Sequence, residues 1–396
     1  MGVVVDHFKV LRPSFESRQE LALQWIAHVH AYTKTHFQNT DSHAKNLEET
    51  TALMERIVQR FSCLPDKILR RGSEIEDFTH LNFSEMKIFN ITASPQGAPL
   101  SERMTFFARA TQGVFEQFYK HTETAPAHLI HVTCTGYASP SAAQNLISQK
   151  NWGENCQVTH AYHMGCYASL PALRMAQGFL SSSAANSPSV PSRSVGERVD
   201  IVHTELCTLH FNPYLHTPEQ FVIQSLFADG FISYSVVDKK NHKLTPGKNA
   251  FEILAIHEVI FAESQEAMTW KLSEFGFSMT ISRDVPAIIA ENIEQFLHTL
   301  FHQAGHSFTE EKKDVIFAIH PGGPKIIEHI AEILKLSDDR VAVSHKILNS
   351  YGNMSSATLP HIWEDLSRSH TKPGSLVVSL AFGPGLTVAG SLMRVL

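Results

Sequence analysis

The chain has 396 residues, of which 43% are hydrophobic and 18% charged, with a net charge of −6 at pH 7. This composition is ordinary for a globular protein with a large core, and the length predicts two or three domain-sized units. The acidic balance and the lack of a long Lys/Arg run argue against a nucleic-acid surface. No apolar run approaches the ~18 residues that cross a bilayer, so we expect no membrane span.

Five cysteines are scattered along the chain without a CxxC pair: Cys63, Cys134, Cys156, Cys166 and Cys207. An odd number without paired spacing predicts reduced thiols in a cytoplasmic protein, and neither a disulfide framework nor a zinc site. The first residues lack the basic and apolar regions of a signal peptide, and Asp6 stands where a myristoylation motif needs Ser or Thr. The 24 histidines include no HExxH pattern, so we expect no metal.

The order strand, loop, helix repeats along the first half of the chain. Strands are predicted at 8–11, 129–136 with its closing turn, 158–163, 199–203 and 231–237, and helices at 18–33 and 142–148. This order favours an α/β fold with a mainly parallel sheet covered by helices. The Ser- and Pro-rich segment 181–194 predicts a mobile surface loop. The charged turn 238–241 is the predicted boundary between halves 1–238 and 239–396.

The second half has a similar order of elements, without a residue-by-residue repeat. Strands are predicted at 253–257, 314–319 and 375–380, and helices at 287–302 and 325–336. Residues 349–357 are expected to open a further helix. The strand at 375–380 is predicted to be the last one, followed by a glycine turn at 383–385.

Cys166 stands at a position typical of nucleophiles. It follows Gly165, and apolar residues at helical spacing come after it: Leu170, Leu173, Ala176 and Leu180. A turn at the start of a helix places the thiol beside unpaired N–H groups and the positive end of the helix dipole, which stabilise a thiolate. The same donors are suited to an oxyanion. The alternative is a buried structural cysteine.

Two polar residues of the second half, His320 and Asn353, stand at junctions before helices, among Gly, Pro or Ser. An imidazole can pair with a thiolate and move protons near neutral pH, and a carboxamide donates uncharged N–H groups to an oxyanion or enolate. His320 as a strand-end residue and Asn353 as a helix N-cap are the structural alternatives. Spacing alone leaves both a cysteine hydrolase and an acyl transferase open.

Four stretches together resemble the type III polyketide synthases, the chalcone synthase-like family of the thiolase fold. They are residues 165–168, 320–324 (HPGGP), 351–357 (YGNMSSA) and 382–388 (FGPGLTV). The second and third are specific, because the related ketoacyl synthase III enzymes have a different histidine motif. The similarity follows the same order over most of the chain and is weakest before Leu64.

This resemblance implies a thiolase-like, five-layered αβαβα fold with two similar halves, and a homodimer. It implies that Cys166 takes an acyl starter from coenzyme A or an acyl carrier protein. His320 and Asn353 would bind the thioester carbonyls and support the decarboxylation of malonyl-CoA. The resulting enolate would extend the chain by two carbons in each round, before cyclisation to a pyrone or resorcinol-type product. No metal or redox cofactor is implied.

The resemblance also assigns residues around the substrate. Phe227 and Met279 would form the gate between the coenzyme A tunnel and the cavity, and Met279 replaces a family phenylalanine. Four residues would line the cavity: Cys207, His210, Trp270 and Ser355. Plant chalcone synthases carry Thr, Thr, Gly and Ser there, so we expect a product other than chalcone. Trp270 either redirects the elongation pocket or simply fills core.

Three cations within five residues, Lys67, Arg70 and Arg71, fall in the region that contacts coenzyme A phosphates in the family. From the residues alone they indicate either a solvated surface or a phosphate clamp.

Other hypotheses stay open beside a type III polyketide synthase. One is a single-condensation, ketoacyl synthase III-like enzyme or a simple thiolase-fold acyl transferase. Another is a catalytically silent thiolase-fold subunit that binds a partner, although the presence of Cys166, His320 and Asn353 argues against it. A cysteine protease would also use such a set, but it gives no reason for the glycine turn at 383–385.

Overall fold

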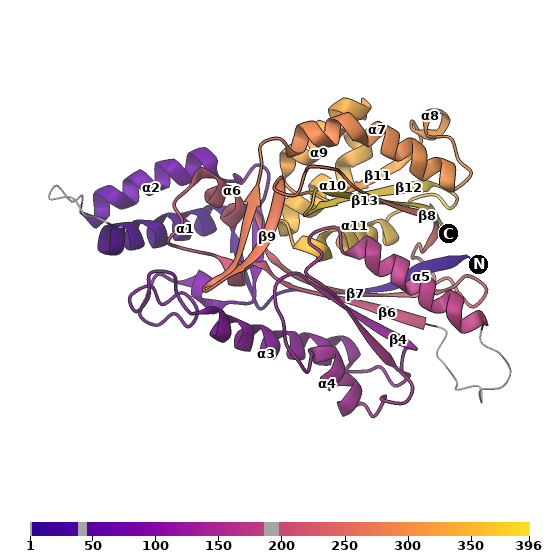
Figure 1. Cartoon of the computed structure of the whole chain (residues 1–396), viewed down its shortest axis with the longest axis horizontal. Coiled ribbons are helices and arrows are strands. Elements are labelled where there is room, and N and C mark those ends of the chain that lie inside the picture. Colours follow the sequence, from indigo (N-terminus) through magenta and orange to yellow (C-terminus); the bar gives the residue numbers. More distant parts are fainter. Residues whose placement is uncertain (1, 39–45, 186–197) are drawn as a thin grey trace.

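A computed structural model describes residues 2–38, 46–185 and 198–396 (Figure 1). Their largest sheet has nine strands in the order β11-β12-β13-β8-β1-β7-β6-β4-β5. In that order the strands are Ile316–Ile319, Leu376–Gly383, Thr387–Val395, Phe251–Ile260, Val3–Leu11, Asp229–Asp238, Arg198–Leu206, His128–Thr133 and Gln157–Tyr162. Two antiparallel pairs lie outside it: β2 (Phe15–Arg18) with β3 (Arg70–Ser73), and β9 (Met268–Ser273) with β10 (Gly276–Ile281).

The α-helices of the described residues are numbered α1 to α11 in chain order. They are Gln19–Thr33, Leu47–Phe61, Leu100–Tyr119, Ala142–Gln149, Ser169–Ala185, Pro218–Leu226, Val285–Gln303, Phe308–Glu311, Pro324–Leu334, Asp338–Tyr351 and Thr358–Ser367. Four short helices join them: η1 (Lys34–Gln38), η2 (Glu76–Thr79), η3 (Cys207–His210) and η4 (Ser355–Ala357). None of the helices in the described ranges is both long and apolar enough to span a bilayer.

The sheet is divided into two wings, because β1 and β8 pair over a ladder of only three residues on each strand. Helices α5 and α11 lie between the wings, while α7 and α9 cover one outer face and α3 and α4 the other (Figure 1). The layers are therefore helix, sheet, helix, sheet, helix, and the predicted five-layered α/β architecture is confirmed.

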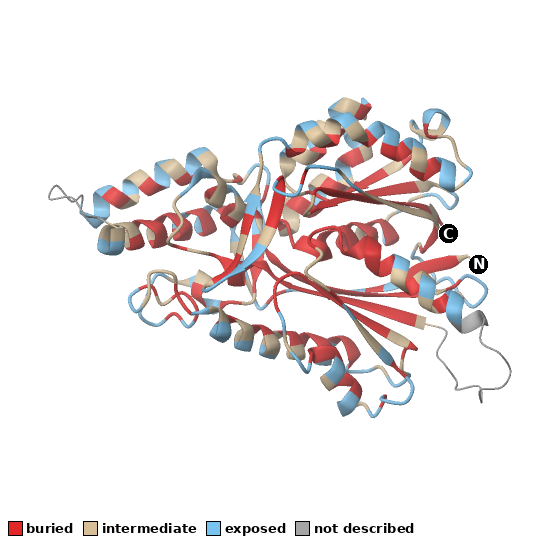
Figure 2. Cartoon of the chain, viewed as in Figure 1, coloured by how far each residue is buried: buried red, intermediate tan, exposed pale blue. Residues whose placement is uncertain are grey.

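The helix α5 is buried because its sequence is apolar around most of its first turns. Leu170, Ala172, Leu173 and Ala176 have no exposed surface and pack against strands of both wings. A helix with apolar residues on several faces is stable only inside a core, and the two alanines let the sheets approach closely. Figure 2 shows the same burial along the strands and α11.

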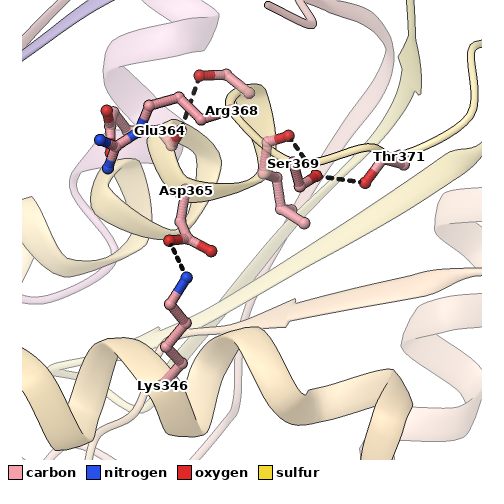
Figure 3. A network of polar contacts seen from close by, with 8 residues as sticks. Lys346, Glu364, Asp365, Arg368, Ser369 and Thr371 are labelled. Carbon is pink, nitrogen blue, oxygen red and sulfur yellow. Dashed lines mark hydrogen bonds and ion pairs between the residues drawn. The ribbon is translucent and has the colours of Figure 1, made fainter.

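The loop that carries Asn353 is held between two helices that are tied together at the surface. Lys346 of α10 forms an ion pair of 2.6 Å with Asp365 of α11, and Arg368 pairs with Glu364 at 2.8 Å (Figure 3). Such exposed pairs each contribute about 0–1 kcal/mol, so they orient the loop more than they stabilise the fold.

The prediction of a mainly parallel sheet is wrong, because five of the eight strand pairings in the nine-stranded sheet are antiparallel. Two predictions about local elements are also corrected. The strand at 375–380 is not the last, because the glycine turn leads into β13, which pairs with β12 and β8. The Ser-rich segment begins as helix, because α5 continues to Ala185; residues 186–194 lie outside the described residues. The predicted boundary at 238 coincides with the end of β7, and the division into two domains stays a prediction.

Six histidines are buried in the described part, and burial lowers the pKa of each: His30, His131, His203, His210, His320 and His361. In the unfolded chain they would take up protons near pH 6.5, so stability is lost as the pH falls below that value. Three carboxyl groups whose pKa burial raises, Asp229 (to about 7), Glu205 and Glu364, oppose this trend but are fewer than the histidines.

We therefore expect the melting temperature to fall by more than about 5 °C between pH 7.5 and pH 5, measured by differential scanning fluorimetry. Replacing one buried imidazole, as in His361→Gln, should make the dependence shallower. An unchanged melting temperature over this interval would contradict the argument.

Candidate active site

Cys166 lies in a turn between β5, which ends at Tyr162, and α5, which begins at Ser169. Gly165 has a φ of +86°, and a Cβ there would lie 2.4 Å from Cδ of Pro384. Only glycine combines this backbone conformation with so close an approach. The turn before Cys166 is therefore packed directly against the glycine turn that follows β12.

Cys166 lines a cavity, most of whose lining is apolar. Six residues that the resemblance placed around the substrate also line it: Phe227, Met279, Cys207, His210, Trp270 and Ser355. Pro384 and Cys134 complete the wall beside the thiol. The fold thus brings these positions together around Cys166, and their individual roles stay predictions.

Asn353 is held so that its amide nitrogen is free. Its backbone pairs with the segment around Phe227, through N–H to the Leu226 carbonyl at 3.0 Å and through its own carbonyl to the Ala228 N–H at 2.9 Å. Its side-chain Oδ1 accepts the N–H of Ser355 at 2.8 Å. Because the acceptor end is fixed in this way, the buried Nδ2 is left without a hydrogen-bond partner. The Asn353 side chain lowers the pKa of the Cys166 thiol, which places it beside that group.

Ser355 lies between two thiols in a strained backbone conformation. Its φ is +49°, a region that residues with a side chain seldom adopt. The Cys166 thiol donates to the Ser355 hydroxyl at 3.7 Å, and the same hydroxyl lowers the pKa of Cys134. Strain of this kind is retained where the position of a side chain matters more than local stability.

His320 follows β11 directly and is almost fully buried. Its backbone N–H donates to the Leu380 carbonyl of β12 at 2.7 Å, and the loop after it reaches the segment paired with Asn353, where Gly323 approaches Leu226. Both ring nitrogens lack a hydrogen-bond partner among the described residues. Such unpaired buried groups cost about 1–3 kcal/mol each, so they call for a ligand or a chemical role.

Burial keeps both Cys166 and His320 uncharged. It raises the pKa of the Cys166 thiol to about 12, although the nearby side chains of Ser355 and Asn353 lower that pKa, and it lowers the pKa of His320 to about 3. The expectation that the helix start stabilises a resting thiolate is therefore wrong: the desolvation of a thiol in an enclosed cavity outweighs the nearby N–H groups.

Sequence reasoning missed a buried carboxyl group beneath the site. Glu205 accepts hydrogen bonds from the Cys134 N–H at 2.9 Å, from the Thr135 hydroxyl at 2.9 Å and from Ser356. Burial raises the pKa of Glu205, and its charge in turn raises that of Cys166. No local pattern singles out Glu205, because β6 also carries Asp200, His203 and Thr204 among its buried residues.

The three predicted phosphate-binding cations do not share one surface. Lys67 and Arg70 are exposed, in ion pairs with Glu328 at 2.8 Å and Glu16 at 3.4 Å. Arg71 is buried and donates to the Gln19 side chain and to the carbonyls of Gln224 and Phe227. Its guanidinium is therefore occupied in holding the segment that leads to Phe227.

Comparison with known proteins gives one family match and several relatives. Residues 252–396 match the family model for the C-terminal domain of chalcone and stilbene synthases. Type III polyketide synthase C of Arabidopsis thaliana is 31% identical over 272 residues, which are 67% of this chain and 67% of that protein. Probable polyketide synthase 1 of Dictyostelium discoideum is 30% identical over 269 residues, 67% of this chain but only 8% of that much longer protein.

Two solved structures share the fold across the whole chain. The C-terminal type III polyketide synthase domain of Steely1, a type I/III hybrid from Dictyostelium, superposes with a TM-score of 0.78 at 22% identity, covering 100% of this chain and 99% of that one. Polyketide synthase PKS-I of the brown alga Ectocarpus siliculosus gives 0.80 at 20% identity, covering 100% and 98%.

Because the Cys166 thiol is neutral at pH 7, we expect its alkylation by iodoacetamide to accelerate about tenfold per pH unit between pH 7 and pH 10. Peptide mass spectrometry would give the rate at this cysteine alone. Ser355→Ala removes a group that lowers the pKa, so it should slow the reaction at pH 8, whereas Ser337→Ala at the exposed start of α10 should not. An alkylation rate at Cys166 that is already constant above pH 7 would contradict a thiol that is neutral at pH 7.

Proposed function

Because the chain belongs to the type III polyketide synthase family, we propose that it loads an acyl starter on Cys166 and extends it with malonyl-CoA by decarboxylative Claisen condensation. Two observations support the proposal. The Cys166 thiol lines a mostly apolar cavity, and two buried side chains have unpaired nitrogens, Asn353 beside that thiol and His320 directly after β11. A hydrolase would need access for water, which such a cavity disfavours.

Loading begins with a neutral thiol and a neutral imidazole. The Cys166 sulfur attacks the carbonyl carbon of the incoming thioester as its proton passes to His320, and the new S–C bond forms while the carbonyl oxygen becomes an oxyanion. The Asn353 amide donates to that oxygen. The C–S bond to coenzyme A or to a carrier thiol then breaks, and the departing thiolate takes the proton from His320.

Extension uses the same donors for a different anion. When the malonyl carboxylate leaves as carbon dioxide, its bonding electrons pass to the α-carbon and the thioester oxygen as an enolate. Asn353 and His320 donate to the enolate oxygen, and an apolar cavity favours the loss of the localised carboxylate charge. The enolate carbon attacks the thioester on Cys166, a C–C bond forms, and the sulfur is released as thiolate. No metal or redox cofactor takes part.

The lining of the cavity that Cys166 faces is mostly apolar, which suits a growing acyl chain. We therefore propose several rounds, followed by cyclisation to a pyrone or resorcinol-type product. The acyl transferase class, and the use of acyl-CoA or acyl-carrier-protein starters, belong to the same proposal. A product of one extension only would favour the single-condensation alternative.

We further propose that the enzyme is a homodimer joined through β5. This strand is at the edge of the nine-stranded sheet, pairs with β4 on one side, and carries exposed residues such as Gln157 and His160. An unpaired edge strand readily adds a strand from another chain. Antiparallel pairing of two β5 strands would extend the sheet across a two-fold axis.

Two substitutions test the chemistry. We expect Cys166→Ala to abolish acyl loading and product formation, with Cys156→Ala, a buried cysteine outside the cavity, unaffected. Asn353→Ala should slow both steps, because it removes a donor to the oxyanion of loading and to the enolate; we expect malonyl-CoA decarboxylation to fall by about 10²–10³-fold and loading to fall by less.

Loading is read by intact-protein mass spectrometry and decarboxylation by release of labelled carbon dioxide, with Asn292→Ala on α7 as the matched control. Product from Cys166→Ala, or an Asn353→Ala enzyme that fails only in loading, would contradict this mechanism.

The assembly proposal predicts a molar mass twice that of the 44.2 kDa chain by light scattering. His160→Glu would place like charges opposite each other across antiparallel β5 strands, so it should shift the mass toward the monomer, more so at low salt. His302→Glu, at an exposed position of α7, should leave the mass unchanged. A monomeric wild-type protein at micromolar concentration would refute the dimer.

A further inference from the structure

A second cavity, open to solvent, lies against the β9–β10 hairpin beside the cavity that Cys166 lines. Three residues line both cavities: His210, Gln220 and Phe277. These residues therefore form a partition between the two spaces, of which the rings of His210 and Phe277 are the larger part.

The partition is a cluster of three rings. The Phe277 ring stacks on His210 with a centroid separation of 4.2 Å and an interplanar angle of 11°. Trp270 meets each of them nearly edge-on, with both centroid separations at 5.5 Å. Such clusters are rigid, because each ring fills the space that would let its neighbour turn.

Two of the three rings are also anchored by hydrogen bonds. His210 donates from Nε2 to the Thr135 carbonyl at 2.8 Å and accepts the backbone N–H of Phe277 on Nδ1 at 3.0 Å. Trp270 donates from Nε1 to the Cys134 carbonyl at 2.6 Å. The Phe277 ring has packing contacts only. It is therefore the one part of the partition that can be removed without leaving a buried polar group unpaired.

We propose that Phe277 sets the length of the acyl chain that the enzyme accepts, by closing the end of the cavity that Cys166 lines. The space beyond it is a latent extension of the substrate site. With the phenyl ring present, short acyl thioesters fit and long ones meet the partition; without it, the two spaces join and a long, unbranched acyl chain passes through. This inference rests on the proposed function and names its substrate class as short acyl thioesters.

The lining of the second cavity is consistent with a passage for the far end of such a chain. Leu215 and Phe275 supply apolar surface, while Gln96, Asn212 and Ser278 are polar. The distal methylenes of the acyl chain would pack on Leu215 and Phe275. The end of the acyl chain would reach the polar residues, where the cavity opens toward solvent. Gly276, with a φ of +142°, lets the hairpin backbone approach His210, so the passage walls stay in place when the Phe277 side chain is shortened.

The test compares acyl loading of the wild-type protein and Phe277→Ala with coenzyme A thioesters of two to sixteen carbons. Intact-protein mass spectrometry follows the Cys166 adduct, so no condensation step is needed for the readout. We expect the wild-type rate to drop at least tenfold between hexanoyl and dodecanoyl thioesters. Phe277→Ala should raise the ratio of the dodecanoyl to the acetyl loading rate at least tenfold over the wild-type ratio, whatever its effect on the acetyl rate itself.

Leu272→Ala is the matched control, because this residue is on the same hairpin, is exposed, and lines neither cavity. Phe277→Leu is a milder opening that should shift the preference in the same direction if the alanine variant is too unstable to study.

Wild-type protein that loads dodecanoyl and acetyl thioesters equally well would overturn the inference, as would opened variants that keep acetyl loading and gain nothing with long chains. If no thioester acylates Cys166 in the wild-type protein, the proposed function itself fails, and the inference about acyl-chain length fails with it.

Discussion

The close contact between Gly165 and Pro384 is the constraint on which the site depends. The first residue precedes the thiol in one wing of the sheet, and the second belongs to the turn between β12 and β13 in the other wing. Tyr167 packs onto Gly383 of the same turn, so Gly383 also has no space for a side chain. Each turn thus has a glycine where the other turn leaves no space for a side chain, and the position of Cys166 relative to the second half follows from that fit.

The second property of the site is that burial keeps its chemical groups neutral and incompletely bonded. A thiol with a pKa of about 12 and an imidazole with a pKa of about 3 hold no ion pair at rest. The unpaired nitrogens of His320 and Asn353 lower the stability of the fold, because they have lost water without gaining partners. An oxyanion or enolate supplies the missing acceptor, so the same groups stabilise the charge that develops during reaction.

Much of the architecture could be predicted from the sequence, because local signals agree with the tertiary structure. The apolar run before Thr133 and the helix after Cys166 follow ordinary periodicity, and the glycine- and proline-rich motifs marked the junctions where His320 and Asn353 lie. The resemblance then predicted which side chains gather around the thiol, which periodicity alone would not have done.

The other features of the site depend on contacts between segments far apart in the sequence, which no local pattern encodes. The pKa of Cys166 reflects how completely the cavity excludes water, and that depends on strands more than a hundred residues away. Arg71 looks like its exposed neighbour Arg70 in the sequence, yet β3 turns it inward onto backbone carbonyls. Glu205 and Phe277 were missed because their importance arises only from what packs against them.

The placement of β1 has a consequence for how the molecule is made. This strand occupies the seam of the sheet, between β7 and β8, so residues near position 5 pair with residues near 236 and 251. During synthesis β1 is therefore made long before either of the strands that it pairs with. Contacts between such distant segments slow folding and leave a hydrophobic strand, rich in valine, exposed on the nascent polypeptide, where chaperones and premature aggregation compete for it.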